Sequence, residues 1–221
     1  MNCPICQNTS LFYQSTFHWK KRDFYCCQRC GFRFVSSETM LTNRDEEDRY
    51  QQHNNSLNDS DYRNYLQKLI QPLMDQLPLM ENGIHLDFGS GKAPLVSELF
   101  KEKNWHSEFY DVYFYPEVPK KQYDIVTSIE VVEHFRDALP NWQELVSLVK
   151  PQGLLLVNTQ IYHHELDPDK DKEKFQHWWY KNDPTHVSIY TDITLNELEK
   201  MFNLERIYFD NIKTIIWRKR S

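Results

Sequence analysis

The sequence contains no long apolar run. No window approaches the 18 or so consecutive apolar residues that a helix needs to cross a bilayer, and the polar start MNCPICQNTS does not resemble a signal peptide. We therefore expect a cytoplasmic protein that does not contact membranes. With 221 residues, the chain is long enough for one α/β domain of ordinary size and a small appendage.

The sequence also lacks an excess of basic residues. Its 26 lysines and arginines face 32 aspartates and glutamates, which gives a formal net charge of −6. A large nucleic-acid-binding face usually makes a domain basic, so this balance argues against one. The first 40 residues are the exception, because they carry five cations and two acids, and a small local basic patch is one interpretation of them.

Cysteine is absent after residue 30. Four of the five cysteines form two C-x-x-C pairs, Cys3 with Cys6 and Cys27 with Cys30, separated by 20 residues. This spacing is typical of a zinc ribbon, in which two tight turns each supply two thiolates to one tetrahedral zinc ion. Disulfides are disfavoured in a reducing cytosol, and no thioredoxin-like pattern surrounds either pair. We predict a zinc-ribbon-like module over residues 1–37.

This module is too small to form a hydrophobic core of its own. Apolar residues at 11–13 and 18–19 indicate a short hairpin between the cysteine pairs, and metal binding would then supply much of the folding free energy. The sequence does not decide whether Cys26 or Cys27 is the zinc ligand, because the two are adjacent.

Residues 38–60 are polar, with a charged run over 43–49 and a tail rich in glutamine and asparagine. This composition indicates a linker, or a lid that orders as a helix when a ligand binds. From residue 61 onward, apolar side chains recur at helical spacing, which indicates the start of a larger domain over residues 61–221.

The larger domain contains a strand, a glycine turn and a helix start within Gly83–Val96, GIHLDFGSGKAPLV. Such a turn lets the backbone approach a nucleotide-like ligand, and the N-terminus of the helix offers free N–H donors. Asp111 closes the next apolar run, about 20 positions later, where an acid can hold ribose hydroxyls. The turn therefore predicts a ligand site at the carboxyl end of its strand.

Three ligand classes use turns of this kind. A phosphate-binding P-loop is disfavoured, since Leu86 stands at its first glycine and Ala93 at the serine or threonine that holds magnesium. A dinucleotide site is disfavoured because Pro94 stands at the third glycine, where helix and strand pack closely. S-Adenosylmethionine remains, since it has no pyrophosphate and depends more on the close turn and the ribose acid.

Strand patterns alternate with helical patterns through the rest of the chain. We predict strands over 105–110, 123–128 and 153–158, helices over 94–103, 141–150 and 195–202, and a final antiparallel hairpin of 205–209 and 213–217. This alternation predicts an α/β fold with a doubly wound, mostly parallel sheet that binds ligands at the carboxyl ends of its strands.

Three stretches, LDFGSGKAP, YDIVTSIEVVEHF and LVSLVKPQGLLLV, resemble the class I S-adenosylmethionine-dependent methyltransferases over about residues 60–221. The resemblance implies a Rossmann-like fold with a seven-stranded sheet and S-adenosylmethionine as cofactor. The glycine turn would wrap the methionine and ribose, although Ala93 replaces a glycine often found in the family. The residues that the resemblance assigns to the cofactor are Asp87, Gly89, Ser90, Gly91, Asp111, Ser128, Ile129 and Glu130.

The stretch EVVEHF places Glu130, Glu133 and His134 at i, i+3 and i+4, so on a helix they would share one face. Two carboxylates and an imidazole can bind a divalent cation such as magnesium. The E-x-x-E-H pattern is similar to that of ubiquinone-biosynthesis O-methyltransferases and small-RNA 2′-O-methyltransferases, where it helps hold a metal against the accepting hydroxyls. The alternative is that His134 lines the pocket without a metal, as in many methyltransferases.

A second group, HWWY at 177–180 followed by DPTHV at 183–187, resembles a signature in a bacterial branch of these enzymes. His186 would act as a general base or as a fourth metal ligand near the methyl group of the cofactor. The alternative is a capped turn with a hydrogen-bonded histidine and with the tryptophans in the core. The candidate catalytic residues are His134, His186 and Glu130.

The sequence thus predicts an enzyme that transfers a methyl group from S-adenosylmethionine, with an oxygen of a small molecule as the favoured acceptor. One alternative is an RNA methyltransferase that docks its substrate through the zinc ribbon. Another is a cofactor-binding regulator without turnover, whose ribbon binds a protein.

Overall fold

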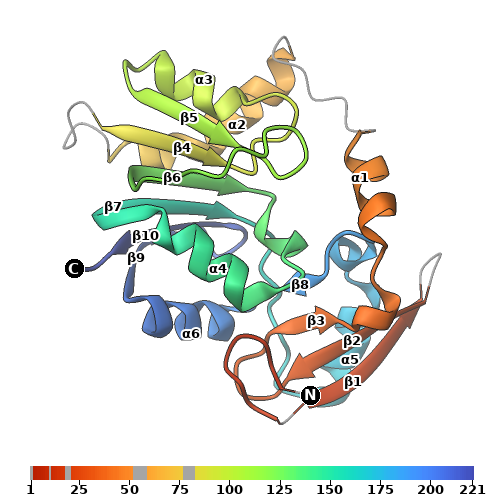
Figure 1. The fold of residues 1–221 in the computed structure, drawn as a ribbon. Helices are drawn as coiled ribbons and strands as arrows, with labels where there is room; N and C mark the ends of the chain where they lie inside the picture. Colours follow the sequence, from red (N-terminus) through yellow and green to blue (C-terminus); the bar gives the residue numbers. More distant parts are fainter. Residues whose placement is uncertain (1, 10, 18–20, 52–58, 77–82) are drawn as a thin grey trace.

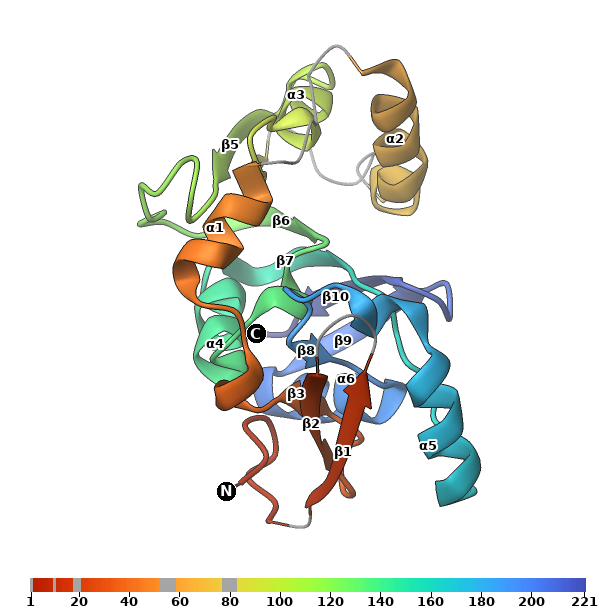
Figure 2. The same cartoon turned by 90° about the vertical axis from the view of Figure 1, so that its right-hand side faces the viewer.

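The computed structural model describes residues 2–9, 11–17, 21–51, 59–76 and 83–221. Parts of the expected hairpin and of the expected linker, at 18–20 and 52–58, lie outside these ranges. The described strands form two sheets, one of six strands and one of four, and the smaller sheet lies below the larger one in both views (Figures 1 and 2). No helix in the described ranges is long and apolar enough to cross a membrane.

The larger sheet has the strand order β5-β4-β6-β7-β10-β9. Its first four strands run parallel, and β10 pairs antiparallel with both β7 and β9. The predicted mostly parallel α/β fold is confirmed, together with the final hairpin. The strands are β4 Ile84–Phe88, β5 His106–Tyr110, β6 Tyr123–Ile129, β7 Val149–Asn158, β9 Leu204–Phe209 and β10 Thr214–Lys219.

Helices cover both faces of this sheet (Figure 1). On one face, α2 and α3 bring Leu69 and Phe100 into a cluster with Ile125 of β6. On the other face, α4 brings Trp142 into a cluster with Val126, the next residue of β6. Successive strand residues point to opposite faces, so the apolar run of β6 serves both clusters. The helices are α2 Ser60–Met74, α3 Leu95–Lys101, α4 Ala138–Ser147 and α6 Asp192–Phe202.

The expected count of seven strands is corrected to six for the described residues. Residues 111–122 connect β5 to β6, and they contain a bridge between Asp111 and Tyr115 followed by an irregular loop. A parallel crossover needs about a dozen residues or more, so this segment is too short to add a helix and another strand. Strand β5 is consequently an edge strand.

The smaller sheet combines the N-terminal segment with a distant part of the chain. Strands β1 and β2 form the predicted hairpin, β3 pairs with β2, and β8 pairs antiparallel with β3. Helix α5 packs beside this sheet, where the rings of Phe24 and Phe175 meet edge to face at 5.1 Å. The cysteine-bearing segment therefore shares a sheet with β8, which lies in the C-terminal half of the chain. These elements are β1 Leu11–Phe17, β2 Lys21–Cys27, β3 Arg33–Val35, β8 Ser188–Ile189 and α5 Pro168–His177.

The polar segment after β3 contains helix α1, Asn43–Gln51. This helix runs from the smaller sheet toward the carboxyl ends of the central strands (Figure 1). Arg49 forms an ion pair with Asp183 at 2.5 Å, and Glu46 forms one with Arg136 at 2.9 Å. The helix is thus attached to the two loops that carry His134 and His186 in the sequence.

Candidate functional site

The glycine turn after β4 folds back against β5. The N–H groups of Gly89 and Ser90 both donate to the carbonyl oxygen of Tyr110, at 2.8 and 3.1 Å. Gly89 has a φ of +77°, and a Cβ atom there would lie 2.3 Å from Val131 Cγ2, so only glycine fits. Gly91 has a φ of +62°, but a Cβ atom there would meet no described atom within 4 Å. The turn therefore leaves open space beside Gly91 for close approach of a ligand.

Asp111 joins the glycine turn to the neighbouring strand. Its Oδ2 accepts a hydrogen bond from the N–H of Gly91 at 2.9 Å, and its Oδ1 accepts from the N–H groups of Tyr113 and Phe114. A carboxylate oxygen can accept about two hydrogen bonds, so Oδ2 retains capacity for a ligand hydroxyl. The structure therefore brings the predicted ribose acid next to the predicted turn.

Asp87 lies at the end of β4 and is buried within the sheet. Burial raises the pKa of Asp87 to about 7, although hydrogen bonds from the Ser97 backbone and from the Thr127 hydroxyl act in the opposite direction. The charge of Asp111 raises this pKa further. The ionisation of Asp87 therefore lies near neutral pH, where a cationic ligand group would favour the carboxylate.

Ser128, Ile129 and Glu130 lie at the carboxyl end of β6. Glu130 has a φ of +54°, a left-handed conformation that costs a non-glycine residue about 1 kcal/mol or more. Among the described residues, Ser128 Oγ and Asn158 Oδ1 are buried without a hydrogen-bond partner. Buried polar atoms are nearly always hydrogen-bonded, so these two atoms at adjacent strand ends fit a polar ligand.

The backbone over EVVEHF is not one continuous helix. The structure has one 3₁₀ turn, η3 Val132–His134, and Glu130 precedes it in the left-handed conformation. The N–H of Glu130 donates to the carbonyl oxygen of Asn158 at 2.8 Å, which extends the pairing of β6 with β7 by one residue. The helical turn therefore begins only at Val132. Glu130, Glu133 and His134 therefore do not share one helical face.

Tyr180 joins the two glutamates instead, a role that the sequence reasoning missed. It lies in the 3₁₀ turn η4, Trp179–Asn182. Its O–H group contacts Glu130 Oε2 at 3.1 Å and Glu133 Oε1. The only sequence signal was its place in the aromatic run before DPTHV. That run is not simply core, because Trp179 is 65% exposed.

One ligand atom each of Glu133, His134 and His186 lies within 4.8 Å of the others. Nδ1 of His134 lies 3.0 Å from the carbonyl oxygen of Thr185, and Nδ1 of His186 lies 2.8 Å from that of Tyr180. A carbonyl oxygen only accepts, so Nδ1 carries the proton in both neutral rings and Nε2 carries the lone pair. Glu133 Oε2 is buried without a hydrogen-bond partner among the described residues.

This cluster lacks Glu130 and contains His186, which the sequence analysis named as a possible general base or fourth metal ligand. Burial lowers the pKa of His186 to about 4, although the charge of Asp183 raises it. Burial also raises the pKa of Glu133, and the neighbouring Glu130 charge raises it further. The neutral imidazole of His186 is the form that accepts a proton or binds a metal ion.

Tyr50 of helix α1 forms a wall of the same site. Its ring lies 5.4 Å from the ring of His134 and 5.2 Å from that of Tyr113, measured between centroids. Burial is the main cause that raises the pKa of Tyr50. The sequence reasoning missed this residue, because the polar segment around it predicted only a linker or lid.

The four predicted zinc ligands converge beside the smaller sheet. The Sγ atoms of Cys3 and Cys30 are 3.6 Å apart, those of Cys6 and Cys27 are 3.5 Å apart, and all four lie within 4.8 Å of one another. Around a tetrahedral zinc ion with Zn–S bonds of about 2.3 Å, the sulfur atoms are about 3.8 Å apart. The spacing and the donor type therefore fit one zinc ion.

Cys26 lies outside this cluster because side chains alternate along β2. Its Sγ lies 3.6 Å from Nη1 of Arg33, and it belongs to a different apolar cluster. Of these two adjacent cysteines, the direction of the strand thus places Cys27, and not Cys26, in the thiol cluster.

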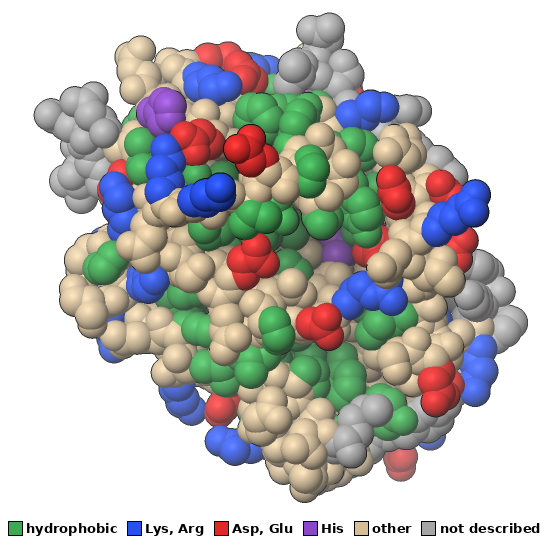
Figure 3. All heavy atoms as spheres, in the orientation of Figure 1, with side chains coloured by type: hydrophobic (Ala, Val, Ile, Leu, Met, Phe, Trp, Pro, Cys, Tyr) green, Lys and Arg blue, Asp and Glu red, His purple; other side chains and the backbone are tan. Residues whose placement is uncertain are grey.

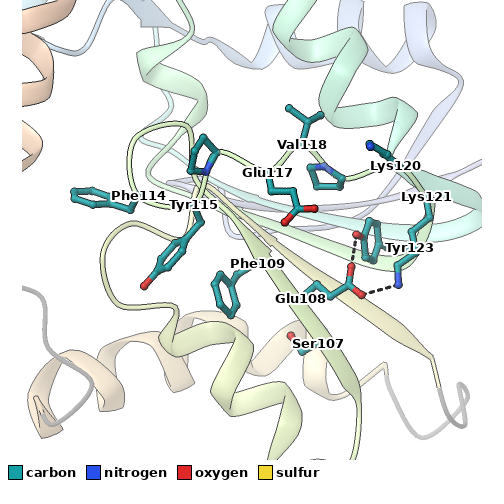
Figure 4. Close-up of a pocket in the computed structure, with 12 residues that line it drawn as sticks. Ser107, Glu108, Phe109, Phe114, Tyr115, Glu117, Val118, Lys120, Lys121 and Tyr123 are labelled. Carbon is teal, nitrogen blue, oxygen red and sulfur yellow. Dashed lines mark hydrogen bonds and ion pairs between the residues drawn. The ribbon is translucent and has the colours of Figure 1, made fainter.

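A separate hollow of about 820 Å³ lies along edge strand β5 and the loop that follows it (Figure 4). Its lining is mixed, since Glu108 pairs with Lys121 and accepts a hydrogen bond from the O–H of Tyr123. None of the predicted site residues lines it. The hollow is therefore distinct from the glycine turn.

A doubly wound sheet with a glycine turn and an acid at the next strand end defines a class of α/β proteins that bind nucleotide-like ligands. Comparison with protein families specifies the class: a family described as Methyltransferase domain matches residues 59–208. The match covers more than half of the chain, so the chain belongs to this methyltransferase family. No curated protein matches its sequence.

Solved structures of similar shape include an O-methyltransferase family protein from Burkholderia thailandensis, with 14% identity and a TM-score of 0.49. The similarity covers 80% of this chain and 63% of that one, so the chain spans less than two thirds of its length. The N-methyltransferase NodS from Bradyrhizobium japonicum, solved with S-adenosyl-L-homocysteine, has 11% identity and a TM-score of 0.48, over 80% of this chain and 98% of that one. With TM-scores below 0.5, neither likeness bears on the substrate.

Proposed function

We propose that this methyltransferase transfers the methyl group of S-adenosylmethionine to a hydroxyl oxygen of a small molecule. The observation that carries the proposal is the convergence of Glu133, His134 and His186 beside the glycine turn. Val131 connects the two places, since it lies against Gly89 and adjoins the 3₁₀ turn that carries Glu133 and His134.

The glycine turn suits S-adenosylmethionine, which supplies an electrophilic sulfonium methyl group. The open space beside Gly91 admits the ligand to the backbone, and Asp111 Oδ2 retains capacity for a ribose hydroxyl. The carboxylate of Asp87 suits the amino group of the methionine part, and the unpartnered Ser128 Oγ suits a polar ligand atom. Ile129 and Glu130 complete the cofactor wall at the end of β6.

The two histidines provide proton acceptors for the substrate hydroxyl. Their Nε2 atoms carry the lone pair, and a positioned general base contributes about 10²- to 10⁴-fold to a rate. Glu133 lies within 4.8 Å of both imidazoles. A protonated ring there would favour the carboxylate form of Glu133, which in turn would stabilise the ring's charge. Glu130 acts on this group through the O–H of Tyr180. Alignment of hydroxyl and methyl group supplies the rest of the rate enhancement.

The same cluster offers a donor set for a divalent cation. Two imidazole nitrogens and one carboxylate suit a first-row transition ion such as Mn²⁺ better than Mg²⁺, which prefers oxygen ligands. The unpartnered, buried Glu133 Oε2 fits such an ion. A bound cation would lower the pKa of the substrate hydroxyl. The predicted magnesium is therefore replaced in the proposal by a transition-metal cation.

We also infer one structural zinc ion in the cluster of Cys3, Cys6, Cys27 and Cys30. None of the five cysteines forms a disulfide in the structure, and a reducing compartment such as the cytoplasm keeps such thiols available for zinc. Zinc would then tie the N-terminal turn to the turn between β2 and β3.

The ribbon does not favour RNA as the substrate. Of its five cations, Arg22 and Arg33 are buried, and Lys21 and Arg29 lie 3.1 and 3.7 Å from acidic side chains. Lys20 lies outside the described residues. On the face shown in Figure 3, basic and acidic side chains are interspersed over a band of hydrophobic ones. These observations favour a small molecule over RNA as the methyl acceptor, because RNA binding needs exposed cations for the phosphate backbone.

The proposal is tested by calorimetric titration with S-adenosylmethionine and NAD, followed by transfer of labelled methyl to a panel of catechols, phenols and diols. We expect binding of S-adenosylmethionine alone and transfer to oxygen, stimulated by Mn²⁺ after chelation. His186→Gln should lose transfer and keep cofactor affinity, whereas the exposed His163→Gln should behave as wild type. Salt-sensitive transfer to RNA, with none to the panel, would overturn the proposal.

A further inference from the structure

The loop that carries His186 directs three carbonyl groups toward one guanidinium. Arg22 donates from Nη1 to the carbonyl oxygens of Lys181 and Asp183, at 2.5 and 2.7 Å, and from Nη2 to that of His186 at 2.6 Å. Arg22 belongs to β2 of the zinc-ribbon module, so a residue from the N-terminal sheet organises a loop that lies more than 150 positions later.

The same loop directs two other carbonyl groups toward the candidate site. The carbonyl oxygen of Tyr180 meets Nδ1 of His186 at 2.8 Å, and that of Thr185 meets Nδ1 of His134 at 3.0 Å. These two contacts set which ring nitrogen carries the proton. The carbonyl groups that bind Arg22 are interspersed along the chain with those that bind the histidines, so a change on one side would rotate peptide groups on the other.

The chemistry of Arg22 fits this role better than that of another cation. Its side chain is 6% exposed and lies over the ring of Phe24, with Cζ 5.1 Å from the centroid. A guanidinium presents five donors in a rigid plane, whereas a lysine ammonium is a flexible point charge. Burial lowers the pKa of Arg22 to about 10, which still leaves it charged at neutral pH. Three converging carbonyls compensate part of the cost of burying that charge.

A second connection joins the smaller sheet to the same site. The N–H of Val35, at the end of β3, donates to the carbonyl oxygen of Val187 at 2.9 Å. The N–H of Val187 in turn donates to the carbonyl oxygen of Glu133 at 2.8 Å. The ribbon therefore reaches both the loop of His186 and the backbone of Glu133.

We propose that Arg22 is a positioning residue for the methyl-transfer site. It holds the loop so that Tyr180 and Thr185 fix the Nδ1–H form of His186 and His134, and Nε2 of both rings is presented to the substrate. The zinc-ribbon module is then a structural part of the active site rather than a docking module for a macromolecule. The effect on methyl transfer rests on the proposed function, whereas the effect on the protonated ring nitrogen does not.

The test compares Arg22→Lys with Arg29→Lys, since Arg29 is an exposed arginine of the same module. Nitrogen-15 NMR of the imidazoles in the zinc-loaded protein identifies the protonated ring nitrogen. In the wild type and in Arg29→Lys we expect Nδ1–H for both His134 and His186. In Arg22→Lys we expect a loss of that preference and a decrease in methyl transfer of about 10²-fold, the scale of a misplaced catalytic group, with unchanged affinity for S-adenosylmethionine.

The outcomes separate the two proposals. Retention of both Nδ1–H forms and of the wild-type rate in Arg22→Lys would overturn the role of Arg22. A changed ring form with an unchanged rate would support that role and overturn the proposed use of the histidines. If Arg22→Lys does not fold, hydrogen exchange of the wild-type guanidinium decides the question. Slow exchange at Arg22 Nη relative to Arg29 supports the clamp, and equally fast exchange contradicts it.

Discussion

The N–H of Gly91 donates a hydrogen bond to Oδ2 of Asp111 at 2.9 Å. The two residues lie just past the carboxyl ends of adjacent parallel strands, β4 and β5. This bond makes the glycine turn and the candidate ribose acid one unit. The cluster of Glu133, His134 and His186 lies on other loops, so cofactor binding and chemistry can be tested separately.

Asp111→Asn should weaken binding of S-adenosylmethionine by about tenfold or more, because an amide offers one acceptor oxygen where the carboxylate offers two. Glu117→Gln is the control, because it removes one negative charge from an exposed residue of the loop that follows Asp111. Calorimetry measures both variants. Asp111→Ala is less informative, since it also removes the acceptor for three backbone N–H groups. Equal affinities of Asp111→Asn and the wild type would show that this acid does not hold the cofactor.

Two glycine variants separate stability from binding. Gly89→Ala should destabilise the protein by about 2 kcal/mol or more, because its Cβ would lie 2.3 Å from Val131 Cγ2 at a φ of +77°. Gly91→Ala meets open space and should cost only about 1 kcal/mol from its positive φ. Its Cβ would nevertheless fill the space proposed for the cofactor, so affinity should fall more than stability. Urea denaturation and calorimetry measure the two effects, and an unchanged affinity of Gly91→Ala would argue against that placement.

The stability of the protein should depend on pH through Asp87. Burial raises the pKa of this carboxyl from its ordinary 3.8 to about 7, so the folded state keeps a proton that the unfolded state has lost within that range. The free energy of unfolding should therefore decrease as pH rises from about 4 to about 7, by at most about 1.4 kcal/mol per pH unit.

Urea denaturation across this range should show a shallower dependence for Asp87→Asn than for the wild type. The exposed Asp137→Asn removes one negative charge without removing a buried group, so its pH dependence should match that of the wild type. Parallel curves for Asp87→Asn and the wild type would mean that Asp87 titrates normally.

Tyr180→Phe should reduce methyl transfer by about tenfold and leave cofactor affinity unchanged. The variant removes the O–H that contacts Glu130 and Glu133, and a hydrogen bond to a charged group contributes about 1.5 to 3 kcal/mol. Tyr208→Phe, an exposed tyrosine, is the control. Steady-state kinetics with an acceptor identified in the panel measures the change, and an equal rate in both variants would exclude a role for the tyrosine hydroxyl.

Zinc content should distinguish the two adjacent cysteines. Cys27→Ser should lose stoichiometric zinc and lower the melting temperature, because one thiolate is missing from the cluster. Cys26→Ser should retain zinc, since its Sγ lies on the other side of β2 near Arg33. Elemental analysis after gel filtration gives the result, and loss of zinc in both variants would contradict the assignment of Cys27.

Local patterns were sufficient for much of the fold. Thr191 and Thr194 form a capping box that starts α6 at Asp192, a few residues before the helix predicted over 195–202. The alternation of apolar runs predicted the parallel sheet, and C-x-x-C spacing predicted the thiol cluster. The count of strands was wrong, because it came from the resemblance and not from the length of residues 111–122, which leaves no room for a further strand.

The candidate site depended on contacts between distant segments. Nothing local in EVVEHF shows that Glu130 extends the strand pairing, or that Tyr180 and His186 approach Glu133. In the sequence, Arg22 was only one of five cations near the N-terminus. In the structure it binds three carbonyl groups of the loop that carries His186.

The sequence by itself determined the α/β fold, the glycine turn, the acid beside it and the cysteine pairs, because each depends on residues close together along the chain or on strand periodicity. Only the tertiary structure decided which cysteine faces the cluster, which side chains join His134, and how the N-terminal segment reaches the site. Those features depend on the direction of side chains and on pairings across more than 150 residues, such as that of Arg22 with His186, and short-range patterns carry no information about them.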